Sequence, residues 1–318
     1  RYSVTHLRVR SFRCSAALRD LDAHVGDPST YSSDTALALP ELPEVETIVS
    51  DLRPLLLGRR IEAVDVRFPT IVRHPEPEVF ERDLPGEVVS SVNRRGKYIL
   101  IGLEGGSGGE EQRLLVVHLG MTGQLLHKLP DQVRRPHTHV VLALDNGTEL
   151  RYSDPRRFGR LLLGTERDLV AARKLPKLGP EPLDSNFTSS DLRRRLRGRR
   201  APLKMLLLDQ SLLAGVGNIY ADEACFTAGI RPDRPPTRIS ALRVRRLHAA
   251  LRESLLMGLA NRGSSIDDYV DLYGAKGRQQ EELRVYGRGG RPCVGCGRVL
   301  TLIRLGGRAT VFCRKCQR

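Results

Sequence analysis

The segment Leu39–Thr47 reads LPELPEVET and predicts the start of the folded part of the chain. Pro43 suits the first position of a helix, because a proline's missing N–H would be unsatisfied there anyway. Glu44 and Glu46 fall in the first turn, where the helix dipole favours carboxylates. Apolar residues follow at helical spacing, at positions 45, 48, 49, 52, 55 and 56. An amphipathic helix is therefore expected here.

After this helix the pattern becomes that of short strands. Runs rich in β-branched residues lie at 88–92, 98–103 and 114–119, separated by glycine and polar residues. The sequence Asp145-Asn146-Gly147 lies between two further runs, 139–144 and 148–152, and predicts a two-residue hairpin turn. Residues 40 to about 170 are therefore expected to form an antiparallel β-sandwich with flanking helices.

From about 185 to 285 the apolar spacing is helical, over segments 190–196, 201–208, 217–228 and 240–261. Gly215-Val216-Gly217 separates two of them like the connector of a helix–turn–helix unit. The predicted fold class is α+β. We expect an extension over 1–39 and domains over 40–173, 174–286 and 287–318.

The net charge of the 318-residue chain is +15, which points to a polyanionic partner, nucleic acid before lipid. Residues 291–318 hold seven Lys or Arg and no acid, and residues 193–204 hold seven more. Such clustering is interpreted as a binding footprint, although a basic solvated surface would also raise the total. No run approaches the ~20 apolar residues of a membrane span, so no membrane role is expected.

Two cysteine pairs lie in the last 26 residues, Cys293 with Cys296 and Cys313 with Cys316. Runs at 299–303 and 309–312 predict a hairpin that brings the pairs together. Four thiolates complete the tetrahedral shell of one Zn²⁺ and leave no open position, which indicates a structural ion. Two disulfides or a redox pair are the alternatives.

The first 39 residues carry little net charge, are rich in Ser, Thr, Asp, Gly and Pro, and lack sustained periodicity. They are predicted to be disordered. Their first 19 residues contain Arg and Ser but no acid, a weak match to an organellar transit peptide. The alternative is upstream sequence that does not belong to the mature protein.

Several motifs in order resemble one family, the formamidopyrimidine-DNA glycosylases, also called 8-oxoguanine DNA glycosylases. They are PELPEVET (40–47), RGKY (95–98), HLGMTG (118–123), DPRRFG (154–159), KLGPEPL (177–183), GVGNIYA (215–221) and VYGR (285–288). The resemblance covers residues 40–318 and implies a helix-two-turn-helix second domain and a C-terminal zinc-finger hairpin. The related endonuclease VIII branch usually begins Pro-Glu-Gly-Pro-Glu, whereas Leu42 here favours the oxidised-purine branch.

The resemblance implies that the nucleophile is the secondary amine of an N-terminal proline, here Pro40. A terminal amine has a pKa of about 7.7–8 against about 10.4 for lysine, so more of it is unprotonated at neutral pH. Attack on C1′ expels the base, and β- and δ-elimination then cut the strand. Glu41 is implied as the acid that assists ring opening, Glu44 as its support, and Lys97 as a phosphate contact beside the lesion. Helix-start electrostatics is the alternative for Glu41 and Glu44, and it accounts for Glu46. For Glu41, which precedes the helix beside the nucleophile, catalysis is favoured.

Four further residues are implied as phosphate contacts: His118, Lys177, Asn218 and Arg308. Without the resemblance, Asn218 would be interpreted as a turn residue.

Removing a nucleotide from the stack leaves a void. Met121, Arg156 and Phe158 resemble the family's void-filling residues, with core packing as the alternative for the first and last. Segment 263–280 corresponds to a lesion-capping loop, in which Arg278 stands where many relatives have an aromatic residue.

The expected partner is double-stranded DNA containing oxidised purines or abasic sites, bound by a monomer in the bacterial cytoplasm. One structural Zn²⁺ is expected, with no catalytic metal or organic cofactor.

One feature conflicts with this chemistry, because the nitrogen of Pro40 is a tertiary amide while residues 1–39 are attached. Leu39 stands where the family has its initiator methionine, and a leucine codon can start bacterial translation. We therefore hypothesise an active enzyme that begins at Pro40, by this start or by proteolysis. The alternatives are a catalytically inactive damaged-DNA-binding homologue and a zinc-ribbon RNA-binding protein.

Overall fold

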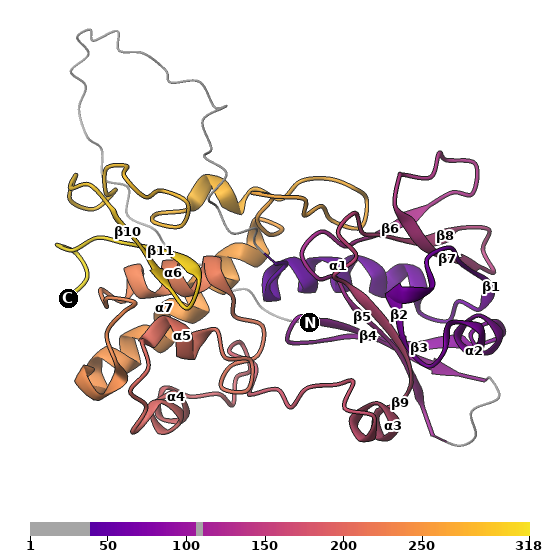
Figure 1. Ribbon diagram of the computed structural model, residues 1–318, viewed down its shortest axis with the longest axis horizontal. Coiled ribbons are helices and arrows are strands. Elements are labelled where there is room, and N and C mark those ends of the chain that lie inside the picture. The colour runs from indigo at the N-terminus through magenta and orange to yellow at the C-terminus, as the bar shows by residue number, and fades with distance from the viewer. Residues whose placement is uncertain (1–38, 106–110) are drawn as a thin grey trace, which may run out of the picture. The chain divides into compact units, whose positions relative to one another are not determined.

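The computed structural model describes residues 39–105 and 111–318, so nearly all of the extension predicted to be disordered lies outside these ranges. Helix α1 spans Leu42–Leu56, with a proline in its first turn as predicted. Most of its apolar face is buried, with Val45, Ile48 and Leu52 at 0% exposure and Leu55 partly buried. In Figure 1, α1 runs from the helical part of the chain to the sheets.

Two sheets pack around a shared apolar core that also receives α1. Their strand orders are β2-β9-β5-β4-β3 and β1-β7-β8-β6. The strands are β1 (Ile61–Val66), β2 (Val72–His74), β3 (Val88–Arg95), β4 (Tyr98–Glu104), β5 (Arg113–His118), β6 (Gln124–Lys128), β7 (Thr138–Leu144), β8 (Glu149–Ser153) and β9 (Arg160–Thr165), with helices α2 (Pro77–Asp83) and α3 (Glu166–Ala171). Every pair of neighbouring strands is antiparallel except β2 and β9, which run parallel. The predicted sheet domain with flanking helices is confirmed.

The hairpin between β7 and β8 lies where the sequence predicted it, but its turn has three residues and not two. Leu144 N–H donates to the carbonyl of Thr148 at 2.9 Å, which leaves residues 145–147 in the turn. Gly147 takes the left-handed φ of 74° that closes the turn. The Asn146 side chain also accepts from the Thr148 amide at 3.2 Å. This side-chain acceptor stabilises the longer turn.

The second domain consists of helices around a separate core, which Leu42 of α1 also joins. Its helices are α4 (Ser189–Leu196), α5 (Leu203–Leu207), α6 (Asn218–Thr227) and α7 (Ala241–Ala260), as predicted to within a few residues. None of the helices in the described ranges is both long and apolar enough to cross a membrane. Leu42 packs in the helical core, whereas the other buried apolar residues of α1 pack in the core of the sandwich. The start of α1 therefore lies at the junction of the two domains.

The C-terminal module is an antiparallel hairpin of β10 (Thr301–Leu305) and β11 (Arg308–Phe312), held by buried polar groups of the helical domain. Lys204 and Asp222 form an ion pair at 2.8 Å with both side chains at 0% exposure. Lys204 Nζ also donates to the Ala309 carbonyl at 2.8 Å, and Asp222 accepts from the Val311 amide at 3.1 Å. The pair therefore fixes β11 on α6.

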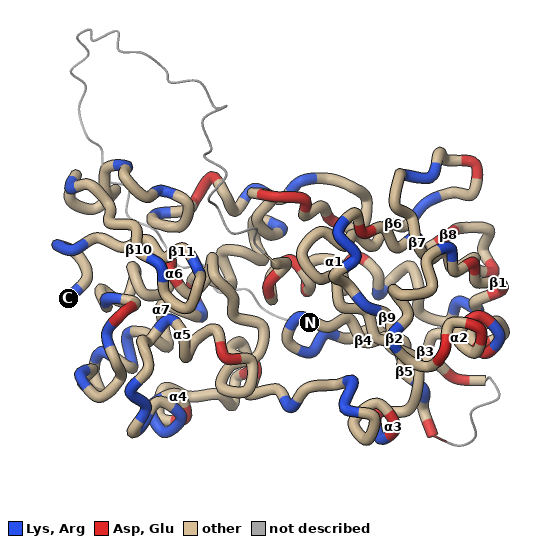
Figure 2. Tube along the Cα trace, in the orientation of Figure 1, with Lys and Arg blue, Asp and Glu red and all other residues tan. Residues whose placement is uncertain are grey.

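Figure 2 shows the basic residues of the α4 region and of the C-terminal hairpin. The interpretation of all seven cations over 193–204 as one footprint is wrong for Lys204, because it is fully buried in the ion pair. The other six cations are exposed arginines, at positions 193 to 195 on α4 and at 197, 199 and 200 after it. One of them, Arg194, also forms an ion pair with Asp191.

Candidate active site and DNA-binding surface

The candidate active site lies where the start of α1 meets the start of α6. The Leu42 amide donates to the Gly215 carbonyl at 3.0 Å, which joins the two helix starts. The Glu41 carboxylate accepts from the amides of Gly217 at 2.7 Å and Ile219 at 2.8 Å. A Cβ on Gly217 would lie 2.3 Å from Cδ of Glu41, so only glycine permits this approach. The free amides at the start of α6 therefore bind the side chain of Glu41.

Glu44 supports the same residue from the other side. It accepts from the Glu41 amide at 2.9 Å and from the Tyr220 hydroxyl at 2.8 Å. It also accepts from the Ser264 amide at 2.8 Å, a contact from the segment after α7. Both carboxylates are 1% exposed. Glu44 therefore links three parts of the chain that are far apart in sequence.

Burial changes the proton affinity of these groups. It raises the pKa of Glu41 to about 7, against the lowering effect of Lys97 and of the α6 amides. Burial likewise raises the pKa of Glu44, and it lowers the pKa of Lys97, with Arg308 adding to that lowering. A carboxyl group with a pKa near 7 donates and accepts protons at neutral pH, as general acid–base catalysis requires.

A cavity of about 280 Å³ opens beside Glu41. Besides Glu41, four residues predicted for the site line it: Lys97, His118, Asn218 and Arg308. Lys97 comes from the turn between β3 and β4, Asn218 starts α6, and Arg308 starts β11, so both domains and the C-terminal hairpin contribute. Pro40 is buried next to Glu41, and Leu39 lines the cavity.

His118 and Lys177 differ from simple cationic phosphate contacts. Burial, with Arg160 and Lys97 adding to it, lowers the pKa of His118 to about 3, so the ring is neutral at physiological pH. Its Nδ1 accepts from the Gly120 amide at 3.1 Å, which leaves Nε2 to carry the proton and donate. Lys177 is exposed and does not line the cavity, although its neighbours Pro176 and Leu178 do.

The three predicted void-filling residues lie on two adjacent turns. Phe158 is 55% exposed, and the guanidinium carbon of Arg156 lies 4.8 Å from its ring centroid. Core packing is therefore wrong as an interpretation of Phe158. Met121 is half-buried on the turn before β6. Buried Asp154 joins the turns, accepting from Thr122 Oγ1 at 2.5 Å and from the Gly159 amide at 2.8 Å.

Tyr220 and Asp154 were not predicted as site residues, and Gly217 was predicted only as part of a helix connector, although all three fall inside the quoted motifs. Tyr220 and Gly217 belong to GVGNIYA, and Asp154 begins DPRRFG. Only their contacts with Glu44, Glu41 and Thr122 reveal what they do, because those partners come from distant segments.

The four C-terminal cysteines have converged as predicted, with all four sulfurs within 4.8 Å of one another. The Sγ–Sγ distances are 3.8 Å for Cys293 and Cys316 and 3.5 Å for Cys296 and Cys313. These distances are far above the roughly 2.05 Å of a disulfide bond and close to the edge of a ZnS₄ tetrahedron with bonds of about 2.3 Å. The cluster is suited to hold one metal ion and leaves no ligand position for substrate.

The fold and the site define a class of protein: a two-domain scaffold in which a sheet domain and a helical domain meet at a buried carboxylate beside a cavity lined by Lys and Arg. Family models match both parts, the formamidopyrimidine-DNA glycosylase N-terminal domain at residues 39–161 and the H2TH domain at residues 178–270. The chain belongs to the formamidopyrimidine-DNA glycosylase family.

A formamidopyrimidine-DNA glycosylase of Moorella thermoacetica is 49% identical over 266 residues, which is 84% of this chain and 95% of the relative. Among solved structures, wild-type Lactococcus lactis Fpg bound to DNA containing N7-benzyl-Fapy-dG has a TM-score of 0.79 at 33% identity, covering 88% of this chain and 100% of the other. Lactococcus lactis Fpg bound to DNA with an abasic site also has a TM-score of 0.79 at 33% identity, covering 87% of this chain and 99% of the other.

Proposed function

We propose that this protein is a bifunctional DNA glycosylase of base excision repair that removes oxidised purines and then cuts the strand at the same nucleotide. The observation that carries the proposal is the geometry of Glu41, a buried acid with a pKa of about 7 beside Pro40 and a cavity lined by Lys97 and Arg308. The relatives bound to DNA containing N7-benzyl-Fapy-dG and to DNA with an abasic site support the choice of substrate.

In the proposed reaction the free amine of Pro40 attacks C1′ of the damaged nucleotide. The N–C1′ bond forms, the bond from C1′ to the base breaks, and the base leaves with a proton. Glu41, protonated in part at neutral pH, donates a proton to the ring oxygen as the sugar opens to an iminium. The iminium acidifies the C2′ proton, whose loss expels the 3′ phosphate, and a second elimination expels the 5′ phosphate.

The remaining residues are assigned to binding. Lys97 and Arg308 line the cavity as cations suited to the phosphates flanking the lesion, and Asn218 and neutral His118 offer hydrogen bonds there. Exposed Arg156 and Phe158, with Met121, fill the void left by the extruded nucleotide. We assign Lys177 to a phosphate outside the cavity.

Four cysteines close together fit a structural Zn²⁺, which holds the hairpin bearing Arg308. We propose that the protein acts as a monomer on duplex DNA in the bacterial cytoplasm.

The test compares the full chain with a protein that begins at Pro40. Each is incubated with duplex containing 8-oxoguanine, in one reaction with borohydride to trap the covalent complex and in a second without it to map the cleaved ends. Protein beginning at Pro40 is expected to form a trapped covalent complex and to leave phosphates on both sides of the gap. A Pro40→Gly variant of it should lose most of the trapped product. Failure of the protein with the free end to release the base would refute the proposal.

One observation favours a second candidate for the chain as given. Leu39 lines the cavity, and its amide bond to Pro40 removes the nucleophilic lone pair. The full chain is therefore expected to bind lesion-bearing duplex without cutting it, as a damaged-DNA-binding protein does. Strand cleavage by intact full-length protein, verified by mass before and after the reaction, would exclude this candidate.

A further inference from the structure

The segment between α7 and the 3-10 helix Gln279–Glu282 crosses from the helical domain to the sandwich. Tyr269 and Leu272 follow α7 in sequence, yet both are buried in the core formed by the two sheets. At its start, the Ser264 amide donates to Glu44, which in turn holds Glu41. The segment 264–278 therefore connects the catalytic carboxylates with the sandwich.

On the sandwich this segment lies along β6, the edge strand of the four-stranded sheet. The His127 amide donates to the Leu272 carbonyl at 3.1 Å, a backbone contact at the free edge of β6. Two side chains of the same strand add to it: Gln124 Nε2 donates to the Asp268 carbonyl at 2.7 Å, and Lys128 Nζ donates to the Tyr273 carbonyl at 3.3 Å. Three donors from one strand thus fix three successive parts of the segment.

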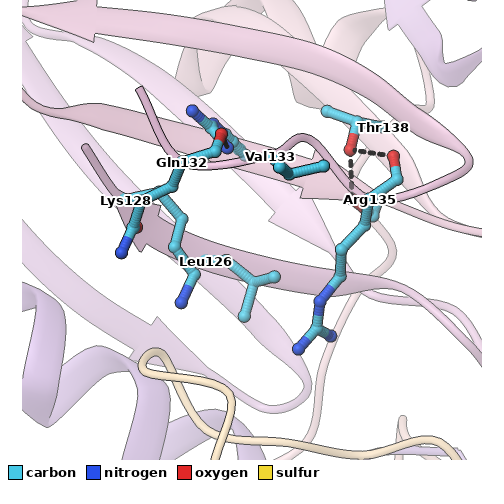
Figure 3. Close-up of a pocket in the computed structure, with 8 residues that line it drawn as sticks. Leu126, Lys128, Gln132, Val133, Arg135 and Thr138 are labelled. Carbon is cyan, nitrogen blue, oxygen red and sulfur yellow. Dashed lines mark hydrogen bonds between the residues drawn. The ribbon is translucent and has the colours of Figure 1, made fainter. Parts of the chain in front are cut away.

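Gln124 also binds a residue of the loop between β6 and β7. Arg135 Nη1 donates to Gln124 Oε1 at 2.7 Å, so both ends of the Gln124 amide are used. Arg135 Nη2 lies only 3.2 Å from the position that a Cβ on Gly274 would occupy, so the guanidinium contacts the segment directly. Lys128 and Arg135 line a pocket of about 220 Å³, and Figure 3 shows Arg135 extending away from the loop that carries Val133.

Within the segment, Asp271 holds the turn that follows. Its Oδ1 accepts from the amides of Tyr273 at 3.0 Å and Ala275 at 2.9 Å. Its Oδ2 pairs with Arg262 at 2.7 Å. Because the turn is held internally, a displacement of residues 268–272 moves the exposed residues after Gly274 with it. At the other end, Gln124 begins β6 three residues after Met121.

We propose that the edge of β6, through Gln124 and with Arg135, is a docking site that fixes residues 268–278 relative to Glu44, which binds the start of the same segment, and to the Met121 turn. Gln124 and Arg135 are therefore positioning residues that determine lesion preference, and they touch no reacting atom. The inference rests on the proposed function, since it assumes that a nucleotide is extruded into the cavity.

Hydrogen exchange of the full chain without DNA tests the docking contact. In a Gln124→Ala variant we expect the Tyr273 and Ala275 amides to exchange about fivefold faster, because the hydrogen bond from Gln124 to the Asp268 carbonyl is lost. A Gln124→Glu variant keeps the acceptor for Arg135 but loses the donor to Asp268, and should behave like the alanine variant. The matched control is Gln112→Ala, whose amide donates to Ser90 on the other sheet. Unchanged exchange in both Gln124 variants would overturn the proposal.

Binding measurements test the coupling to lesion preference. Full chain and variants are titrated with one duplex containing 8-oxoguanine opposite cytosine and with the same duplex carrying a tetrahydrofuran abasic analogue. We expect the ratio of the two affinities to fall about fivefold in both Gln124 variants and to stay unchanged in Gln112→Ala. Faster exchange with an unchanged ratio would also overturn the proposal. If the wild-type chain does not prefer either duplex over undamaged DNA, the proposed function fails, while the exchange data still report on docking.

Discussion

The raised pKa of Glu41 predicts a pH dependence of stability that a single substitution removes. A carboxyl group that binds its proton more tightly in the folded than in the unfolded protein stabilises the fold at low pH. For Glu41 the pKa rises from 4.5 to about 7 on folding. Its contribution is therefore fully present below pH 4.5 and is lost as the pH rises through 7.

The size of the effect follows from the two pKa values. One pKa unit corresponds to about 1.4 kcal/mol, so the rise from 4.5 to about 7 is worth about 3 kcal/mol over the full titration. Between pH 5 and pH 8 the folded protein should lose about 2 kcal/mol of this contribution, an order-of-magnitude figure. Glu41→Gln removes the titrating proton but keeps the shape of the side chain.

The assay is urea unfolding of the full chain and of Glu41→Gln at pH 5, 6, 7 and 8. The variant also turns an NH₂ group toward one of the α6 amides, but that cost does not depend on pH and cancels when profiles are compared. We expect the free energy of unfolding of the wild type to fall relative to the variant as pH rises. Glu62→Gln, at an exposed position on β1, is the control. Parallel profiles for wild type and Glu41→Gln would refute the argument.

Three further predictions concern the supports of the site. Gly217→Ala places a Cβ 2.3 Å from Cδ of Glu41, so single-turnover base release by protein beginning at Pro40 should slow at least about 100-fold with the fold retained. Tyr220→Phe removes the 2.8 Å hydrogen bond to Glu44 and should cost about 1–2 kcal/mol in urea unfolding at pH 7, where an unchanged midpoint would contradict it. Cys296→Ser should lower the amount of metal bound per chain, measured with a chromogenic chelator, and weaken DNA binding about tenfold or more. Metal-free wild-type protein that binds DNA with full affinity would disprove this.

The elements with strong local signals were predictable from the sequence. The helix after Pro43, the strands β3, β4, β5, β7 and β8 and the four helices of the second domain have spacing that reports directly which face is buried. Strand β2 has three residues, and a run this short carries little periodicity. The parallel pairing of β2 with β9 depends on contacts that no local pattern encodes.

The candidate site likewise contains residues that local motifs predict and contacts that depend on distant parts of the chain. The cysteine spacing and the motif residues Glu41, Lys97, Asn218 and Arg308 could be predicted, and the cavity brings these four together. The neutral state of His118 could not, because it follows from burial and from Arg160 on another strand. The docking of residues 268–278 on β6 could not be predicted either, since it joins parts of the chain 144 positions apart.

The ion pair between Lys204 and Asp222 has a practical consequence for measurements at high ionic strength. Dissolved ions screen charges that face water, such as those that contact phosphates, but they hardly reach a pair that is completely enclosed. Raising the salt concentration should thus detach the protein from DNA while the C-terminal hairpin stays seated on α6. The salt dependence of DNA binding would then measure the number of phosphate contacts, without a contribution from a displaced C-terminal hairpin.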